Sequence, residues 1–196
     1  MSDVQVVTTE AVSTRESDSS RDRFNNMIAI AVALLSAFMA VSKVKDDNVV
    51  QGMQKAQAET VDYWNEYQAR RQRQFAVELA IETTRATRPA SPELDARLAE
   101  WKKQADTIKG RADEAATKAK ARAADYEAAN DRDDLFDLSD ALLSVAIALF
   151  AVTALVRVRW LFGAASVLGA AGMVFGVAGF NGWTHLRPGF LVAFLN

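Results

Sequence analysis

The sequence predicts an all-α membrane protein with three transmembrane helices and a long antiparallel helical hairpin, a coiled-coil stalk, between the first and second. Large aliphatic residues are concentrated in two blocks, residues 24–44 and 135–180. The polar segment between these blocks is rich in strong helix formers and has helical periodicity. A single proline-containing break, Arg88-Pro89-Ala90-Ser91-Pro92, lies near the middle of this segment and divides it into two arms of similar length.

The N-terminal part is predicted to be a tail followed by a membrane anchor. Residues 1–22 are mostly Ser, Thr, Asp, Glu and Val, a composition that predicts a disordered polar tail. Residues 23–44 contain an uncharged apolar run with basic residues at both ends, long enough for one bilayer crossing. No A-x-A site follows this run, so we expect an uncleaved anchor, transmembrane helix 1.

Residues 45–134 are predicted to form the extramembrane hairpin, with its turn at 88–91. Each arm would be about 65 Å long at the rise of an α-helix. In arm one, the larger apolar residues approximate a coiled-coil stripe that is polar in places. These residues are Val50, Met53, Val61, Trp64, Phe75 and Leu79.

Arm two begins with Ser91 as the expected N-cap and Pro92 at the first helical position. Alternating steps of four and three residues then mark a seam that changes from large residues to alanine. The seam comprises Leu94, Leu98, Trp101, Ala105, Ile108, Ala112, Ala115 and Ala119, with Arg122 as an interruption before Tyr126. Folding at the break predicts that Trp64 lies near Ala112, Ala115 and Ala116. It also predicts that Phe75 lies near Trp101 and Ala105.

The C-terminal block predicts two further spans, residues 135–156 and 160–180, joined by a short basic turn. Residues 181–196 are too short to cross a bilayer and are expected at its interface. The last span carries a row of small residues that permits close helix contact in lipid. The row consists of Ala165, Gly169, Gly172 and Gly176, and it suits either homo-oligomer formation or packing on the other two spans.

The charge pattern gives an orientation. Arg157 and Arg159 lie in a short turn on the same side as the N-terminus, and short basic turns favour the cytoplasm. The hairpin is too long for its own charges to determine its side. We therefore expect a cytoplasmic N-terminus and a periplasmic hairpin.

Composition excludes several functional classes. The chain of 196 residues has no Cys and one His, which excludes disulfides, thiolate chemistry and a multi-His metal site within one chain. No nucleotide-binding, metalloprotease or nucleophile-elbow motif is present. We expect neither an enzyme nor a bound cofactor or metal. The balanced charge of the hairpin gives no reason to expect nucleic-acid binding.

Two clusters are candidate sites. The first is an aromatic-basic group in arm one, which suits either partner binding or the hairpin core with a solvated face. It comprises Tyr63, Trp64, Tyr67, Gln68, Arg70 and Arg71. The second is Asp137 with Asp140, one turn apart at the start of the second span. Carboxylates in a membrane mark ion or proton paths, but at headgroup level the helix dipole alone favours them.

The chain resembles a family of small bacterial inner-membrane proteins called domain of unknown function 4337. The resemblance covers about residues 24–180. It depends on Phe24-Asn25-Asn26, on the stretch YWNEYQAR at residues 63–70, and on RVRWL at residues 157–161 before a Gly-rich helix. It implies a bacterial inner membrane and three spans, and it supplies no activity and no catalytic residue.

Two functional hypotheses follow. The first is a non-enzymatic membrane scaffold that forms homo-oligomers or is a subunit of a larger membrane complex, because coiled-coil arms and small-residue spans both promote association. The second is a small oligomeric ion channel or transport accessory in which Asp140 faces a pore. The lipid bilayer is the expected surrounding in both.

Overall fold

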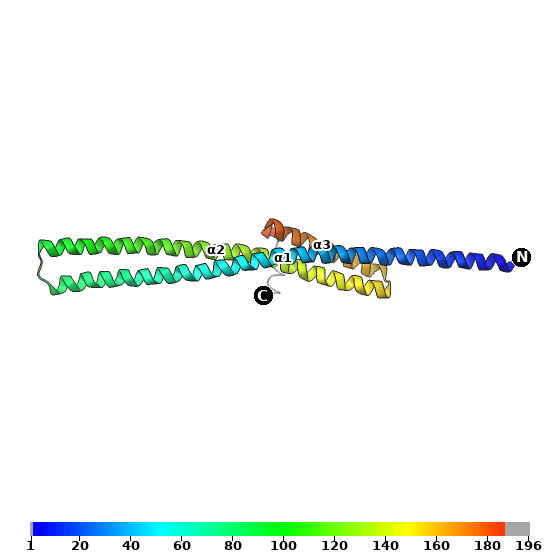
Figure 1. Ribbon diagram of the computed structural model, residues 1–196, viewed down its shortest axis with the longest axis horizontal. Coiled ribbons are helices and arrows are strands. Elements are labelled where there is room, and N and C mark those ends of the chain that lie inside the picture. Colours follow the sequence, from blue (N-terminus) through cyan, green and yellow to red (C-terminus); the bar gives the residue numbers. More distant parts are fainter. Residues whose placement is uncertain (1, 187–196) are drawn as a thin grey trace. The chain divides into compact units, whose positions relative to one another are not determined.

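The computed structural model describes the backbone of residues 2–186 and the side chains of residues 22–185. Helix α1 spans Ser2–Thr87, α2 spans Pro92–Val156, α3 spans Arg159–Asn181, and the short 3₁₀ helix η1 spans Thr184–Leu186 (Figure 1). Within these residues there is no strand, which confirms the prediction of an all-helical chain. Residues 187–196, most of the predicted interfacial segment, lie outside the described part.

Helix α1 begins at Ser2, within the segment 1–22 that composition predicts to be a disordered polar tail. No Pro or Gly precedes Gly52, so nothing in residues 2–51 interrupts a helix. Once the apolar run has nucleated the helix, each further residue adds one hydrogen bond.

The chain divides into two compact units. Unit 1 consists of Met1–Asn48 and Asp131–Asn196, and unit 2 consists of Val49–Asn130. Helices α1 and α2 contribute to both units, whereas α3 belongs to unit 1. Among the described residues, α1, α2 and α3 are each long and apolar enough to cross a membrane.

Unit 1 packs segments of all three helices around small and aromatic residues. Its core cluster consists of Ile28, Leu35, Leu143, Ala146, Phe150 and Ala165. The ring of Phe162 on α3 contacts the rings of Phe24 and Phe150, with centroids 5.6 and 5.4 Å apart. The aromatic side chains therefore connect α3 to α1 and α2 within this unit.

The ends of α3 are fixed by a tight turn and by a glycine cap. Only two residues separate α2 from α3, and Arg157 adopts a left-handed conformation with φ 58°. At the other end, Gly182 has φ 69°, and the N–H groups of Gly182 and Trp183 donate to the carbonyls of Gly179 and Ala178. This is the Schellman arrangement, in which glycine avoids the penalty of a Cβ at positive φ.

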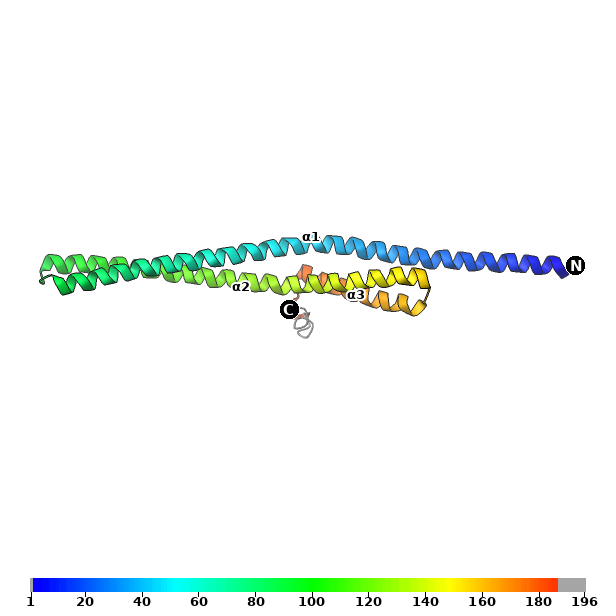
Figure 2. The same cartoon turned by 90° about the horizontal axis from the view of Figure 1, so that it is seen from below.

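In unit 2, the segments of α1 and α2 lie side by side in both views, joined by residues 88–91 (Figures 1 and 2). Leu94 N–H donates to Ser91 Oγ at 3.2 Å, so the predicted N-cap is confirmed. Along α2, the buried and half-buried residues are Leu94, Leu98, Trp101, Ala105, Ile108, Ala112, Ala115 and Ala119. They coincide with the predicted seam of arm two.

The seam of α1 includes Met53, as predicted, but beyond Met53 it differs in phase from the prediction. Its buried and half-buried positions include Met53, Ala56, Thr60, Tyr63, Tyr67, Arg70, Gln74, Val77 and Ile81, again in steps of three and four. Val61, Phe75 and Leu79, predicted on the seam, are 54%, 65% and 51% exposed. Phe75 therefore lies outside the buried seam of α1. The prediction followed the largest apolar residues, whereas polar residues occupy much of this seam.

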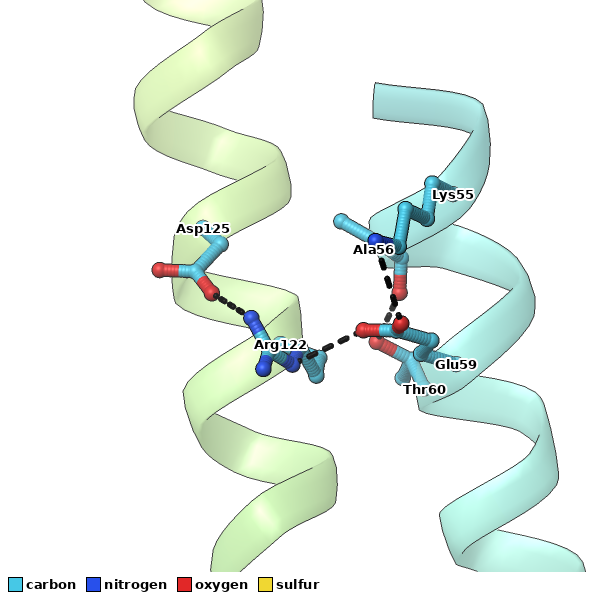
Figure 3. A network of polar contacts seen from close by, with 6 residues as sticks. All are labelled: Lys55, Ala56, Glu59, Thr60, Arg122 and Asp125. Carbon is cyan, nitrogen blue, oxygen red and sulfur yellow. Dashed lines mark hydrogen bonds and ion pairs between the residues drawn. The ribbon is translucent and has the colours of Figure 1, made fainter. Parts of the chain in front are cut away.

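One ion pair connects the two segments of unit 2 near the interruption in the alanine ladder (Figure 3). Arg122 Nε on α2 lies 2.9 Å from Glu59 Oε2 on α1. The same guanidinium donates through Nη1 to Asp125 at 2.8 Å. Arg122 is thus paired with one acidic residue on each helix, which explains why the seam tolerates its charge.

Candidate functional site

The six residues of the predicted aromatic-basic patch do not form one surface. Tyr63, Tyr67 and Arg70 are half-buried on the seam of α1, whereas Gln68 and Arg71 are exposed. The ammonium group of Lys118 on α2 lies 5.7 Å from the centroid of the Tyr63 ring, a cation–π contact between the segments. Half of this predicted patch therefore lies on the seam that faces the neighbouring helix.

Several side chains of the patch contact residues of their own helix. The rings of Trp64 and Tyr67 meet edge to face with centroids 5.5 Å apart. Arg70 Nε donates to Glu66 at 2.9 Å, and Arg71 donates to Gln74 at 2.6 Å. These contacts satisfy the basic groups locally, so they offer little free charge to a partner.

The small residues predicted on the last span are buried in unit 1. Ala165, Gly169, Gly172 and Gly176 all lie on the buried face of α3. A Cβ built on Gly169 would lie 2.9 Å from Leu35 of α1, and one on Gly172 would lie 2.9 Å from Leu143 of α2. Within one copy, this row already packs against the other two helices.

Two polar contacts accompany this small-residue face. Ser139 Oγ on α2 is buried and donates to the carbonyl oxygen of Gly172 on α3 at 2.8 Å. Arg132 donates to the carbonyl oxygens of Gly179 and Phe180 at distances of 3.2 to 3.3 Å. A cation at the C-terminal end of α3 complements the negative end of the helix dipole.

The two predicted intramembrane carboxylates, Asp137 and Asp140, do not form a buried pair. Asp137 is exposed, and Asp140 is half-buried. Nearby, α1 contributes an acidic residue that the sequence analysis missed. Asp46 is 4% exposed, and its Oδ2 lies 2.7 Å from Lys43 Nζ. Its other oxygen, Oδ1, has no hydrogen-bond partner, and neither does the buried Ser42 Oγ one turn earlier.

Asp133 on α2 faces the Asp46 carboxylate. Burial, a hydrogen bond with Asp46 and the negative charge of Asp137 together raise the pKa of Asp133 to about 7, and burial is the largest of these causes. In its protonated form, Asp133 supplies the donor that a carboxylate lacks. The two carboxyl groups then share one proton beside Lys43, which compensates part of the cost of burying Asp46.

The position of Asp46 in the heptad pattern of α1 predicts its burial. Counting back from Met53 in steps of four and three gives Val49, Asp46 and Ser42, so Asp46 and Ser42 continue the seam of α1. A charged residue on a seam is a candidate for an ion pair or hydrogen bond with the neighbouring helix.

Among the described residues, no group of three or more His, Cys, Asp or Glu side chains is arranged to hold a metal ion.

Comparison with known proteins places the chain in a family. No curated protein and no solved structure matches the chain. A family model does match, over residues 24–182, and its description is Domain of unknown function (DUF4337). This region includes the described side chains of α1 from Phe24, all of α2 and all of α3. Because the match covers most of the 196 residues, the chain belongs to the DUF4337 family, as its sequence motifs indicated.

Proposed function

We propose that this protein is a non-enzymatic integral membrane scaffold of the bacterial inner membrane. In this proposal, residues 23–44, 135–156 and 160–180 cross the bilayer. Residues 45–134 form an antiparallel coiled-coil hairpin outside the bilayer. The protein then acts through association, either with further copies or as a subunit of a larger membrane complex.

The observation that carries the proposal is the distribution of side chains in unit 1. Leu155, Val167 and Leu34 are 84%, 69% and 64% exposed, whereas Ser139, Gly172 and Gly176 are buried. Large apolar groups outside and small or hydrogen-bonded polar groups inside suit a lipid surrounding, because lipid provides no hydrophobic drive to bury the large groups. In water, such an apolar surface would promote aggregation.

Unit 2 supports the scaffold part of the proposal. The α1 segment from Val49 to Thr87 would extend about 60 Å at helical rise. Its buried residues form a single line against α2, so most of its surface is free for contacts. Long two-helix arms of this kind give a large contact surface for few residues.

The scaffold proposal is tested by size and partner measurements on protein from native membranes. We expect complexes larger than one chain after extraction in mild detergent, by light scattering with size-exclusion chromatography. Lysine cross-linking in intact membranes should capture the same complexes. A monodisperse monomer, with no cross-linked neighbour, would reject the proposal.

The proposed orientation is testable because the chain has no Cys. We expect Thr107→Cys, in the hairpin, to react with a membrane-impermeant maleimide in intact cells. A cysteine placed at Ser2 should react only after the inner membrane is opened. The reverse labelling pattern would place the hairpin in the cytoplasm.

A second candidate function is supported by the carboxyl groups of unit 1. Asp46 is buried with an unpartnered oxygen, and Asp133 and Asp140 lie on the helix that packs beside it. Acidic groups at the edge of a membrane span are used in ion and proton paths. An ion channel or transport accessory built from several copies, with Asp140 facing a pore, predicts ion flux in liposomes. Flux that is absent, or unchanged by Asp140→Asn, rejects this candidate.

A further inference from the structure

Helix α1 presents a second heptad line on the side of unit 2 that faces away from α2. The residues of this line are Gln54, Ala58, Val61, Asn65, Gln68, Gln72, Phe75 and Leu79, in alternating steps of four and three, and all are exposed. Each lies one or two residues past a seam position, which places it about a third to half of a turn around the helix from the middle of the buried seam. We call these eight residues the back line of α1.

The composition of the back line is that of a contact surface. None of its eight residues is charged, although the same segment of α1 carries many acidic and basic residues on its other faces. In residues 49–130, the large apolar side chains that are exposed are Val61, Phe75 and Leu79, and all three belong to this line. An exposed apolar line at regular heptad spacing is typical of a helix that pairs with another helix.

The amide residues indicate which kind of helix fits. A Gln or Asn side chain carries both donors and an acceptor, so it can pair with the same residue of an identical helix. A charged residue cannot do this, because identical charges repel. Gln68 and Gln72 form two consecutive layers that are each complementary to their own copy, followed by the apolar layers of Phe75 and Leu79.

The corresponding outer face of α2 does not fit a second copy in this way. It carries Glu100, Lys103 and Glu114, all exposed, at the positions opposite its seam. In a symmetric in-register pair, each of these residues would face its own charge across the interface. Like charges directly opposite destabilise such a contact, so α1 rather than α2 is suited to pair with itself.

We propose that the back line of α1 is the surface through which two copies of this chain pair, parallel and in register. This inference rests on the proposed membrane scaffold. Copies inserted with the same topology start their arms at the same membrane surface, so identical helices run in the same direction. Each chain then uses one face of α1 for its own α2 and the opposite face for a second copy.

Single-cysteine cross-linking tests the pairing, because the chain contains no Cys. Gln72→Cys places a thiol on the back line, and Lys103→Cys places one on the outer face of α2. A disulfide requires Cα atoms within about 7 Å, so only a residue near the twofold axis joins to its own copy. In oxidised native membranes, we expect a covalent dimer of Gln72→Cys and none of Lys103→Cys. Equal cross-linking of the two variants overturns the proposal.

A second pair of variants tests whether the apolar layers hold the copies together. Added to Gln72→Cys, the double change Phe75→Glu with Leu79→Glu should reduce the covalent dimer to the level of the Lys103→Cys control. Both side chains are more than half exposed in one chain, so the fold of unit 2 should persist, with unchanged helix content by circular dichroism. The matched change Thr107→Glu, on the outer face of α2, should leave the dimer intact. Unchanged cross-linking in the Phe75/Leu79 variant contradicts the proposal.

Size measurements separate this inference from the scaffold proposal. If lysine cross-linking captures complexes but Gln72→Cys forms no dimer, the back line is not the contact surface and the scaffold stands. If the protein is a monomer in its membrane by both methods, the scaffold and the back-line pairing are both rejected.

Discussion

Arg122 of α2 and Glu59 of α1 form an ion pair, with 2.9 Å between Nε and Oε2, at the position where the alanine seam of α2 is interrupted. The arginine side chain is 46% exposed, and the glutamate side chain is 33% exposed. Exposed pairs of this kind contribute little, because solvent screens them and ordering the side chains costs entropy. The pair therefore explains why the seam tolerates a charged residue, but it contributes little to the free energy of unfolding.

We predict a coupling energy of about 0.5 kcal/mol between Arg122 and Glu59. The double-mutant cycle uses Arg122→Met and Glu59→Gln, with the free energy of unfolding measured by circular dichroism in mixed micelles. The coupling should decrease in high salt. A coupling above about 2 kcal/mol would show that the pair is desolvated, unlike its observed exposure.

The seam of α2 was predictable because its residues follow the simplest rule. Large apolar residues and then alanines recur in steps of four and three, and no polar residue interrupts them until Arg122. Alanine on a seam leaves space for long side chains from the neighbouring helix. The seam of α1 contains Thr60, Arg70 and Gln74, whose polar groups are satisfied by backbone or by neighbouring side chains. Hydrophobicity therefore gave the wrong phase there.

Local sequence also failed to predict the burial of the Asp46 carboxylate. Asp46 follows directly after a basic residue, in the stretch KVKDD, which is typical of a solvated membrane flank. Its burial depends on Lys43 one turn earlier and on Asp133, which is distant in the sequence. Local composition cannot show this second contact. The all-helical fold and the break at residues 88–91, in contrast, follow from local propensity.

We predict that Gly176→Ala destabilises unit 1. A Cβ at Gly176 would lie 2.7 Å from Phe38 Cε1 of α1 and 2.8 Å from Ser139 Oγ of α2, so these side chains or their helices must shift. Overpacking of this kind costs about 1–3 kcal/mol in the free energy of unfolding. Gly163→Ala, also on α3, is the matched control because nothing lies within 4 Å of the added Cβ. Equal stability of the two variants in a detergent-unfolding titration would argue against close packing of this face.

Ser139→Ala should weaken the contact between α2 and α3 by about 0.6 kcal/mol, the average for interhelical hydrogen bonds in membranes. The Ser139 hydroxyl donates to the Gly172 carbonyl at 2.8 Å, from a different helix. Ser166 provides the comparison, because its hydroxyl donates to Phe162 of its own helix, also at 2.8 Å. We expect Ser166→Ala to have a smaller effect on the same unfolding measurement. If Ser166→Ala has the larger effect, the Ser139 contact is not formed in the membrane.

The last prediction concerns pH and the carboxyl pair of unit 1. Because burial and the neighbouring Asp46 raise the pKa of Asp133 to about 7 from an ordinary value of 3.8, the folded protein holds this proton more tightly than the unfolded chain. The resulting stabilisation is fully present below pH 3.8 and is lost as the pH rises through 7. Lys43 and Asp46 on α1, and Asp134 and Asp137 on α2, are the charged groups around it. The melting temperature should therefore fall between pH 5.5 and pH 8.

The variant Asp133→Asn carries a permanently uncharged amide that can still donate to Asp46. We expect it to lose this pH dependence and to be more stable than the parent protein at pH 8, in thermal melts of the detergent-solubilised chain. Asp113→Asn, an exposed carboxylate of unit 2, should retain the pH dependence of the parent. A melting temperature that rises toward pH 8 in the parent, or a slope that persists in Asp133→Asn, would show that the two carboxyl groups do not share a proton. Asp46 would then be a buried carboxylate stabilised by Lys43 alone, and Asp46→Asn should stabilise the protein at every pH.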